Sequence, residues 1–146
     1  MSTNIDSLNI LLKVFVYLHM KQYLLTNGKL KILNFGFPCL ILFNTGAKTN
    51  ILRKTVLAYF KDQGSYYIIA SNGGSKYHPA WYFNLIKNPQ AKIKVNEFTY
   101  NVNAIKLKND QREIYWKKIN DFYNKRYDTY QSKTNREIAI FKLEMI

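Results

Sequence analysis

The chain has few of the residues that build self-contained chemical sites. Its 146 residues include one cysteine, Cys39, which excludes a disulfide within the chain and a cysteine-rich zinc site. It has two histidines, His19 and His78, and its His, Cys, Asp and Glu residues show no cluster with metal-ligand spacing. No nucleophile-elbow motif is present. This shortage fits a protein whose chemistry belongs to a bound cofactor, and the lone thiol fits a reducing, cytoplasmic setting.

Acidic residues are scarce as well. Nine Asp and Glu stand against 22 Lys and Arg, which gives a formal net charge of +13. The resulting positive potential attracts nucleic acid, anionic lipid or phosphate-bearing small molecules. A solubilising role for surface lysines explains the charge equally well, so the charge alone does not identify a partner.

No uninterrupted hydrophobic run is long enough to span a bilayer. A span needs about 20 mostly apolar residues, and the best candidate, 5–25, is interrupted at Lys13, His19, Lys21 and Gln22. We predict instead an amphipathic helix over 1–27. Its expected apolar stripe consists of Leu8, Leu11, Leu12, Phe15 and Leu18. This stripe docks on the rest of the domain, or it gives peripheral membrane contact through residues 5–25.

Short apolar or alternating runs fill most of the remaining sequence and are separated by turn residues. They predict strands at 30–35, 39–43, 55–60, 66–70, 91–95, 98–104 and 138–144. Gly64 marks one hairpin loop and Asn96-Glu97 another, while helices are expected after Pro79 and after Asn109, which would cap its helix. We therefore predict one domain over 1–146 that is mainly β with flanking helices (α+β). Residues 30–146 form an antiparallel barrel with two helices outside it.

Two loops between these strands could hold an anion. In SNGGSKYHP, Gly73 and Gly74 allow a close backbone approach and lead to a helix N-terminus at Pro79, where free N–H groups favour a phosphate. An ordinary strand-to-helix connection explains the same residues. The predicted order of hairpins brings this loop and a second, basic loop, described in the next paragraph, to the same edge of the barrel.

The second loop, TGAKTNILRKT at 45–55, is basic. Lys48, Arg53 and Lys54 stand beside the hydroxyls of Thr49 and Thr55. Arginine can grip two oxygens of a phosphate or carboxylate while lysine supplies a point charge, so the loop suits an anionic group. A solvated basic loop is the alternative.

Three segments together resemble the deazaflavin-dependent nitroreductase family: TGAKTNILRKTVL, ASNGGSKYHPAWYFNLIKNP and WKKINDFYNKRYDTYQSKTNREIAIFKLE. The resemblance runs from about Thr45 to Glu144. It implies a split antiparallel β-barrel of the FMN-binding type. It also implies an oxidoreductase that passes hydride from reduced coenzyme F-420, a deazaflavin, to an electrophilic small molecule such as a nitroaromatic, quinone or enone. Related split barrels often dimerise, which makes a homodimer a further expectation.

The resemblance also implies a set of site residues. The acidic tail of the cofactor would lie against Ala47, Lys48, Thr49, Arg53, Lys54, Thr55 and Val56. Its ring would lie against Ile69, Ala70, Ser71, Asn72, Gly73, Gly74, Ala80, Trp81, Tyr82 and Asn84. Substrate contact would come from Ser71, Tyr127 and Tyr130, although the two tyrosines are equally explained as packing residues.

The basic loop departs from the family pattern at three positions. Ala47 replaces an arginine, Asn50 a glycine and Val56 a proline, and Asn72 stands where some members have lysine. These departures keep FMN as an alternative cofactor. A different class of protein also remains open, a non-enzymatic basic barrel that binds single-stranded nucleic acid through lysine and tyrosine. We favour the oxidoreductase, with a small-molecule acceptor and no nucleic acid partner.

His78 precedes the proline at the helix entrance. The positive end of the helix dipole disfavours a cationic imidazole there, so we expect a neutral, hydrogen-bonding role for His78. His19, on the N-terminal helix, is expected to be a surface or packing residue.

Overall fold

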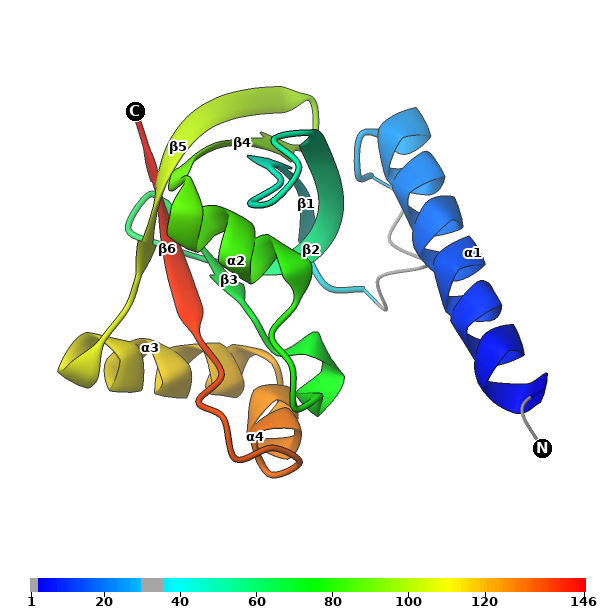
Figure 1. Cartoon of the computed structure of the whole chain (residues 1–146). Helices are drawn as coiled ribbons and strands as arrows, with labels where there is room; N and C mark the ends of the chain where they lie inside the picture. The colour runs from blue at the N-terminus through cyan, green and yellow to red at the C-terminus, as the bar shows by residue number, and fades with distance from the viewer. Residues whose placement is uncertain (1–2, 30–35) are drawn as a thin grey trace.

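The computed structural model describes residues 3–29 and 36–146, with side chains of the first helix from Ile10 onward. Six antiparallel strands form a closed barrel in the order β1-β2-β3-β6-β5-β4 (Figure 1). The elements are α1 Thr3–Thr26, β1 Cys39–Thr45, β2 Leu52–Asp62, β3 Ser65–Ile69, the 3-10 turn η1 Asn72–Gly74, α2 Ala80–Lys87, β4 Gln90–Val95, β5 Phe98–Lys106, α3 Asn109–Phe122, α4 Arg126–Gln131 and β6 Ile140–Met145.

Six of the predicted strands are confirmed, and the seventh, at 30–35, lies outside the described residues. Both predicted hairpins form, with Asp62 paired to Ser65 and Val95 paired to Phe98. The prediction that Asn109 caps a helix is wrong, because Asn109 is the first residue of α3 and Lys108 is the N-cap. Helix α4 lies in a segment where the sequence predicted no helix.

The barrel interior and helix α2 share one hydrophobic core. Side chains alternate along the strands, so that Ile68 points into the barrel while Tyr67 and Ile69 point out of it. Trp81 and Leu85, both on α2, belong to the same buried cluster as the barrel interior. Helix α2 therefore packs against the barrel (Figure 1) and fixes the position of whatever its first turn carries.

A second core lies between the outside of the barrel and the helices α3 and α4. Ile119 of α3 and Tyr123 after it pack with Tyr67 and Ile140, which point outward from β3 and β6. The hydroxyl of Tyr123 donates to the carbonyl of Tyr59 at 2.6 Å, so this buried polar atom is satisfied.

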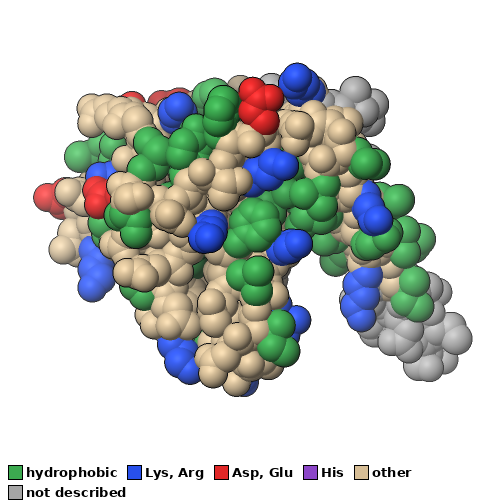
Figure 2. Space-filling model, turned by 90° about the horizontal axis from the view of Figure 1, so that it is seen from above, with side chains coloured by type: hydrophobic (Ala, Val, Ile, Leu, Met, Phe, Trp, Pro, Cys, Tyr) green, Lys and Arg blue, Asp and Glu red, His purple; other side chains and the backbone are tan. Residues whose placement is uncertain are grey.

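Helix α1 stands beside the barrel as an arm (Figures 1 and 2). The side chain of Leu8 lies outside the described residues, and from Ile10 to Leu18 no separate apolar stripe is observed, because large apolar side chains are exposed at every position except Lys13. They are Ile10, Leu11, Leu12, Val14, Phe15, Val16, Tyr17 and Leu18. Apolar residues at eight of the nine positions from Ile10 to Leu18 face all directions around a helix of 3.6 residues per turn. No single face is therefore distinguished, and no described helix is long and apolar enough to cross a membrane.

The C-terminal end of α1 anchors the arm. Tyr23 is buried against Cys39 and Ile41, and its hydroxyl donates to the carbonyl of Lys94 at 3.2 Å and accepts the amide of Asn96 at 2.9 Å. Gly28 ends the helix with a φ of 73°, and a Cβ there would meet the Tyr23 ring at 2.8 Å. The anchor therefore depends on a glycine at this position.

Candidate binding site between the basic loop and helix α2

The two loops singled out from the sequence meet at one open pocket of about 770 Å³. Its lining consists of Gly46, Ala47, Lys48, Thr49, Arg53, Lys54, Thr55, His78, Ala80, Trp81, Phe83 and Asn84. The first seven come from the β1–β2 connection and the start of β2, and the rest come from the approach to α2 and its first turns. The pocket has a volume typical of small-molecule sites.

Backbone hydrogen bonds shape the basic loop. The amide of Gly46 donates to the carbonyl of Ile51 at 2.8 Å, and the amide of Asn50 donates to the carbonyl of Gly46 at 2.9 Å. Asn50 has a φ of 55°, in the left-handed region that asparagine tolerates better than most residues. Asn50 therefore has a backbone conformation that glycine, the family residue at this position, also adopts readily.

The rim of the pocket is positively charged. Lys48, Arg53 and Lys54 are exposed at its edge, and the lining contains no Asp or Glu. Arg53 Nη2 donates to the hydroxyl of Thr49 at 3.4 Å. A fourth cation, Lys87 of α2, donates from Nζ to the carbonyl of Ala47 at 2.6 Å. Sequence reasoning missed Lys87, because its contact with the loop spans 40 residues.

Asn84 ties helix α2 to the basic loop. Its Oδ1 accepts the amide of Ala47 at 2.8 Å, and its Nδ2 donates to Oδ1 of the buried Asn44 at 3.4 Å. Since the Ala47 amide can only donate, it fixes which way the Asn84 side chain is turned. The predicted site residues Ala47 and Asn84 thus hold the two halves of the pocket in one arrangement.

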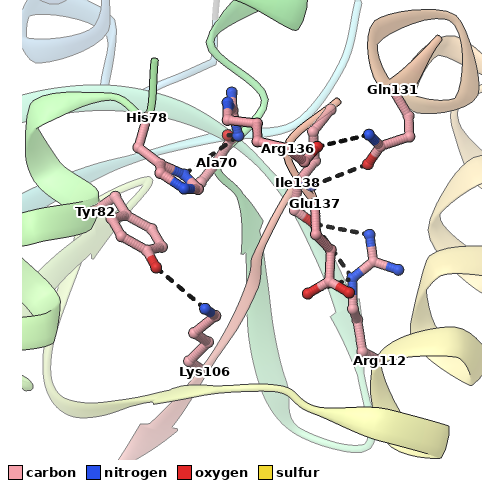
Figure 3. A network of polar contacts seen from close by, with 9 residues as sticks. All are labelled: Ala70, His78, Tyr82, Lys106, Arg112, Gln131, Arg136, Glu137 and Ile138. Atoms are coloured by element: carbon pink, nitrogen blue, oxygen red, sulfur yellow. Dashed lines mark hydrogen bonds and ion pairs between the residues drawn. The ribbon is translucent and has the colours of Figure 1, made fainter. Parts of the chain in front are cut away.

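Aromatic side chains form the other wall. Trp81 is buried and Phe83 is about half exposed. His78 lines the same wall and stacks on Tyr82, with ring centroids 3.9 Å apart and an angle of 9° between the planes. The Tyr82 hydroxyl accepts from Lys106 Nζ at 3.1 Å (Figure 3). A flat apolar wall beside a cationic rim suits a ligand that joins an aromatic ring to an anionic tail.

Several of the predicted ring- and tail-binding residues lie outside this lining. Ala70 is in the barrel core, Ile69 is in the outer core, and Val56 packs near Cys39 and Ile41. Ser71 is half-buried and Asn72, whose Nδ2 donates to the carbonyl of Tyr77 at 3.0 Å, is exposed. Gly73 has open space around it.

Gly74 contacts helix α4. A Cβ at this position would lie 2.7 Å from the carbonyl oxygen of Tyr130 and 3.0 Å from Cβ of Lys133, and its φ is 83°. Real Cβ atoms do not approach backbone that closely. The glycine is therefore needed for packing of the turn against α4, whatever else the turn binds.

The two tyrosines assigned to the substrate pocket lie in the outer core. Tyr127 is 6% exposed, and burial raises the pKa of its hydroxyl well above the ordinary value of 10.0. Tyr130 packs at the edge of the same cluster, with its ring 6.0 Å from that of Tyr127. Neither lines the pocket beside α2. The surroundings of the two tyrosines therefore support a packing role.

Arg136 organises the loop between β3 and α2, and sequence reasoning missed it. Its guanidinium donates to the carbonyl of Ala70 at 3.1 Å, and its Nη1 lies 3.2 Å from Nδ1 of His78 (Figure 3). It also donates to the carbonyls of Ser71 at 2.8 Å and Ser75 at 2.9 Å. Arg136 is 58 to 66 residues from these partners along the chain. From the sequence alone, Arg136 was one basic residue among many, and nothing indicated these partners.

The donors present fit an anionic cofactor tail better at this pocket than at the other one found. A second pocket of about 560 Å³ has, among the described residues that line it, one cation, Lys92, and one hydroxyl residue, Thr45, beside apolar and amide residues. Within the described residues no group of three His, Cys, Asp or Glu could hold a metal ion. The pocket beside α2 combines cations, hydroxyls and an aromatic wall.

Comparisons with known proteins point the same way. A family model described as F420H(2)-dependent quinone reductase matches residues 16–145. A protein of Mycobacterium tuberculosis with the same description is 37% identical over 129 residues, which are 86% of this chain and 87% of that protein.

Two solved structures have a similar fold. A structure described as an F420-H2 dependent reductase is 34% identical, with a TM-score of 0.67, and the match covers 73% of this chain and 94% of that one. A second structure, described as a domain-swapped dimer, is 30% identical, with a TM-score of 0.69, and the match covers 86% of this chain and 95% of that one.

Proposed function

The chain belongs to the F420H(2)-dependent quinone reductase family, and we propose that it oxidises reduced coenzyme F-420 and reduces a quinone. It is an oxidoreductase with the split β-barrel fold, and its cofactor is coenzyme F-420. The family assignment favours this activity over the basic barrel that binds nucleic acid. A quinone acceptor is the finer part of the proposal, and nitroaromatics and enones are acceptors to be tested beside it.

The observation that carries the proposal is the pocket that joins the cationic rim to the aromatic wall. Lys48, Arg53 and Lys54 would bind the acidic tail of the cofactor, with Lys87 adding charge from α2. Trp81 and Phe83 would orient the ring and exclude water from one of its faces. Of the predicted residues at 69–74, the half-buried Ser71 and the exposed Asn72 would border the ring from the β3 end.

The reduced deazaflavin supplies a hydride, and a quinone that takes this hydride with one further proton becomes a hydroquinone. The chain's own residues hold the ring and its acceptor in place for this transfer. In this proposal the hydroxyl of Ser71, half-buried at the end of β3, contacts the acceptor or the ring edge. Tyr127 and Tyr130 support the turn from α4, since the carbonyl of Tyr130 touches Gly74.

The exposed arm adds a second part to the proposal, a homodimer in which α1 packs on a second copy of the chain. Eight large apolar side chains from Ile10 to Leu18 are exposed, which is costly in water. The similar structure described as a domain-swapped dimer supports this choice of partner. A membrane surface is the competing occupant and is one outcome of the test given in the Discussion.

The activity is tested with purified protein, reduced coenzyme F-420 and menadione as a soluble quinone. Saturable, enzyme-dependent return of the oxidised deazaflavin absorbance is expected with the quinone. Separate reactions with FMN in its reduced form test the alternative cofactor. Binding of F-420 without turnover of any quinone, nitroaromatic or enone would contradict the reductase proposal, and turnover only with reduced FMN would replace the cofactor.

A further inference from the structure

His78 is held by Arg136 in a way that decides where its proton lies. Nη1 of Arg136 is 3.2 Å from Nδ1 of His78, within hydrogen-bond distance. A guanidinium has five N–H donors and no acceptor, so Nδ1 must accept. A nitrogen that accepts carries no proton. The single proton of the neutral imidazole is therefore on Nε2.

The surroundings of His78 keep the ring neutral. Burial, with Arg136 and Lys106 adding to it, lowers the pKa of His78 below the ordinary value of 6.5. Every ionisable group recorded around the ring is either cationic, as Arg136 and Lys106 are, or the phenol of Tyr82, which stacks on it. A protonated ring would also place Nδ1–H against the guanidinium N–H.

Arg136 is itself fixed in place, so the tautomer is a built feature of the fold. Gln131 of α4 donates to the carbonyl of Arg136 at 2.7 Å and accepts the amide of Ile138 at 2.9 Å (Figure 3). The three carbonyls that Arg136 binds hold its guanidinium beside the loop that precedes α2. Its hydrogen bond to His78 thus has a fixed direction.

The remaining ring nitrogen is available to a ligand. His78 lines the pocket beside α2. His78 is partly buried, and within the described residues its Nε2 makes no hydrogen bond and is not among the fully buried side-chain polar atoms that lack a partner. An accessible N–H donor on the aromatic wall of a pocket is placed to meet a carbonyl oxygen of a flat ligand.

We propose that His78 is a ligand-contacting residue, a neutral imidazole locked by Arg136 as the Nε2–H tautomer, which donates one hydrogen bond to a carbonyl oxygen of the deazaflavin ring. Arg136 is the positioning residue. The ligand part of the inference rests on the proposed function, whereas the tautomer follows from the protein alone.

The tautomer is tested on the ligand-free, ¹⁵N-labelled chain by long-range ¹H–¹⁵N correlation of the imidazoles at pH 7.5. The chain has two histidines, so His19→Gln assigns the signals of His78 directly. We expect a protonated Nε2 and an unprotonated Nδ1 in the wild-type protein. A protonated Nδ1, or signals averaged between the two tautomers, would overturn the proposal without any substitution at His78 or Arg136.

The contact is tested by titrating oxidised coenzyme F-420 and following its fluorescence. His78→Phe keeps a ring to stack on Tyr82 and loses the donor, whereas His78→Gln loses the ring and keeps an amide donor near the place of Nε2. We expect about tenfold weaker binding for His78→Phe, within the range of one neutral hydrogen bond. His78→Gln should stay within about threefold, and His19→Gln should bind like the wild type.

The order of the two variants decides between hydrogen bonding and packing. If His78→Gln binds more weakly than His78→Phe, or if both bind like the wild type, the donor role is wrong. If the wild-type chain binds no F-420, the proposed function fails and the hydrogen bond to its ring fails with it. The NMR result still reports on the Arg136 lock in that case, so the two failures are distinguishable.

Discussion

Arg53 is the residue whose removal tests the cationic rim most directly. It is exposed at the pocket edge, and its guanidinium reaches Thr49 within the loop. We expect Arg53→Ala to weaken binding of coenzyme F-420 by about 1.5–3 kcal/mol, the range of a charge-assisted hydrogen bond. Isothermal titration measures it. As a control, Lys117→Ala removes an exposed cation from α3 and should leave the affinity for F-420 unchanged. If both changes weaken binding equally, Arg53 acts only through the net charge of the protein and not through a direct contact.

At position 47, where the family pattern has an arginine, a lysine from another element contacts the backbone. Ala47 supplies no cation, but its carbonyl receives the ammonium of Lys87 at 2.6 Å and its amide is held by Asn84. A positive charge is therefore present at the loop although the residue at position 47 is neutral. Lys87 thus lies beside position 47, although it is not among the residues that line the pocket.

His78 also predicts how stability depends on pH. Its pKa is below 6.5 in the folded chain, so the unfolded chain takes up a proton at a higher pH than the folded chain does. The contribution of His78 to stability is complete above about pH 6.5 and is lost as the pH falls toward the lowered pKa. Urea unfolding of wild type and His78→Gln between pH 8 and pH 5 checks this. The variant should lose less stability on acidification, and parallel pH profiles would contradict the prediction.

At the scale of elements, the Gly73-Gly74 turn is a joint between α4 and the strand that leads to the pocket. Both glycines have positive φ, but only Gly74 has backbone and side-chain atoms where a Cβ would be placed. Substitutions at the two glycines therefore form a matched pair. A change at Gly73 tests backbone strain alone, and a change at Gly74 tests backbone strain together with close packing.

We expect Gly73→Ala to cost about 1–2 kcal/mol of stability, the price of a left-handed conformation for alanine. Gly74→Ala should cost at least about twice as much, because overpacking against the Tyr130 carbonyl adds to the same strain. The free energy of unfolding in urea measures both. Equal losses would mean that α4 moves away from the turn at little cost.

Helix α2 connects the pocket to the barrel core. Trp81 and Leu85 are buried with the barrel residues, while Ala80, Phe83 and Asn84 line the pocket from other sides of the same helix. Because one face of α2 is buried, the directions in which its other side chains point are fixed. The positions of the ring-binding residues therefore depend on core packing, and Trp81 belongs both to that core and to the pocket lining.

At the scale of the whole molecule, the arm formed by α1 predicts self-association. We expect light scattering after size exclusion to give the mass of a dimer, because association would remove the exposed apolar side chains of the arm from water. Leu11→Lys should shift the chain toward monomer. Ile114→Lys, which changes an equally exposed apolar residue of α3, should not.

The arm has a competing explanation that the same proteins test. If the wild-type chain stays monomeric at every concentration and instead sediments with vesicles containing anionic lipid, the dimer proposal is wrong and membrane contact through residues 5–25 replaces it. Loss of vesicle binding in Leu11→Lys would then place that contact on the arm.

Period-two patterns and turn residues determined most of the barrel from the sequence. Ile93 and Val95 point inward and Lys92 and Lys94 outward as expected, because a half-buried strand must alternate. Applied to the strand predicted at 98–104, the same alternation places Phe98 inward with Val102, but Phe98 is 58% exposed at the end of its strand. The basic loop was also predictable, since its cations and hydroxyls lie within eleven consecutive residues.

Contacts between distant segments decided the rest. The sequence could not show that Gly74 meets the carbonyl of Tyr130, that Lys87 completes the rim, or that Arg136 sets the proton of His78. Local patterns follow from the backbone geometry of a few neighbouring residues, whereas these partners are 40 to 58 residues apart. Only closure of the barrel and packing of α2 and α4 against it bring them within hydrogen-bond distance.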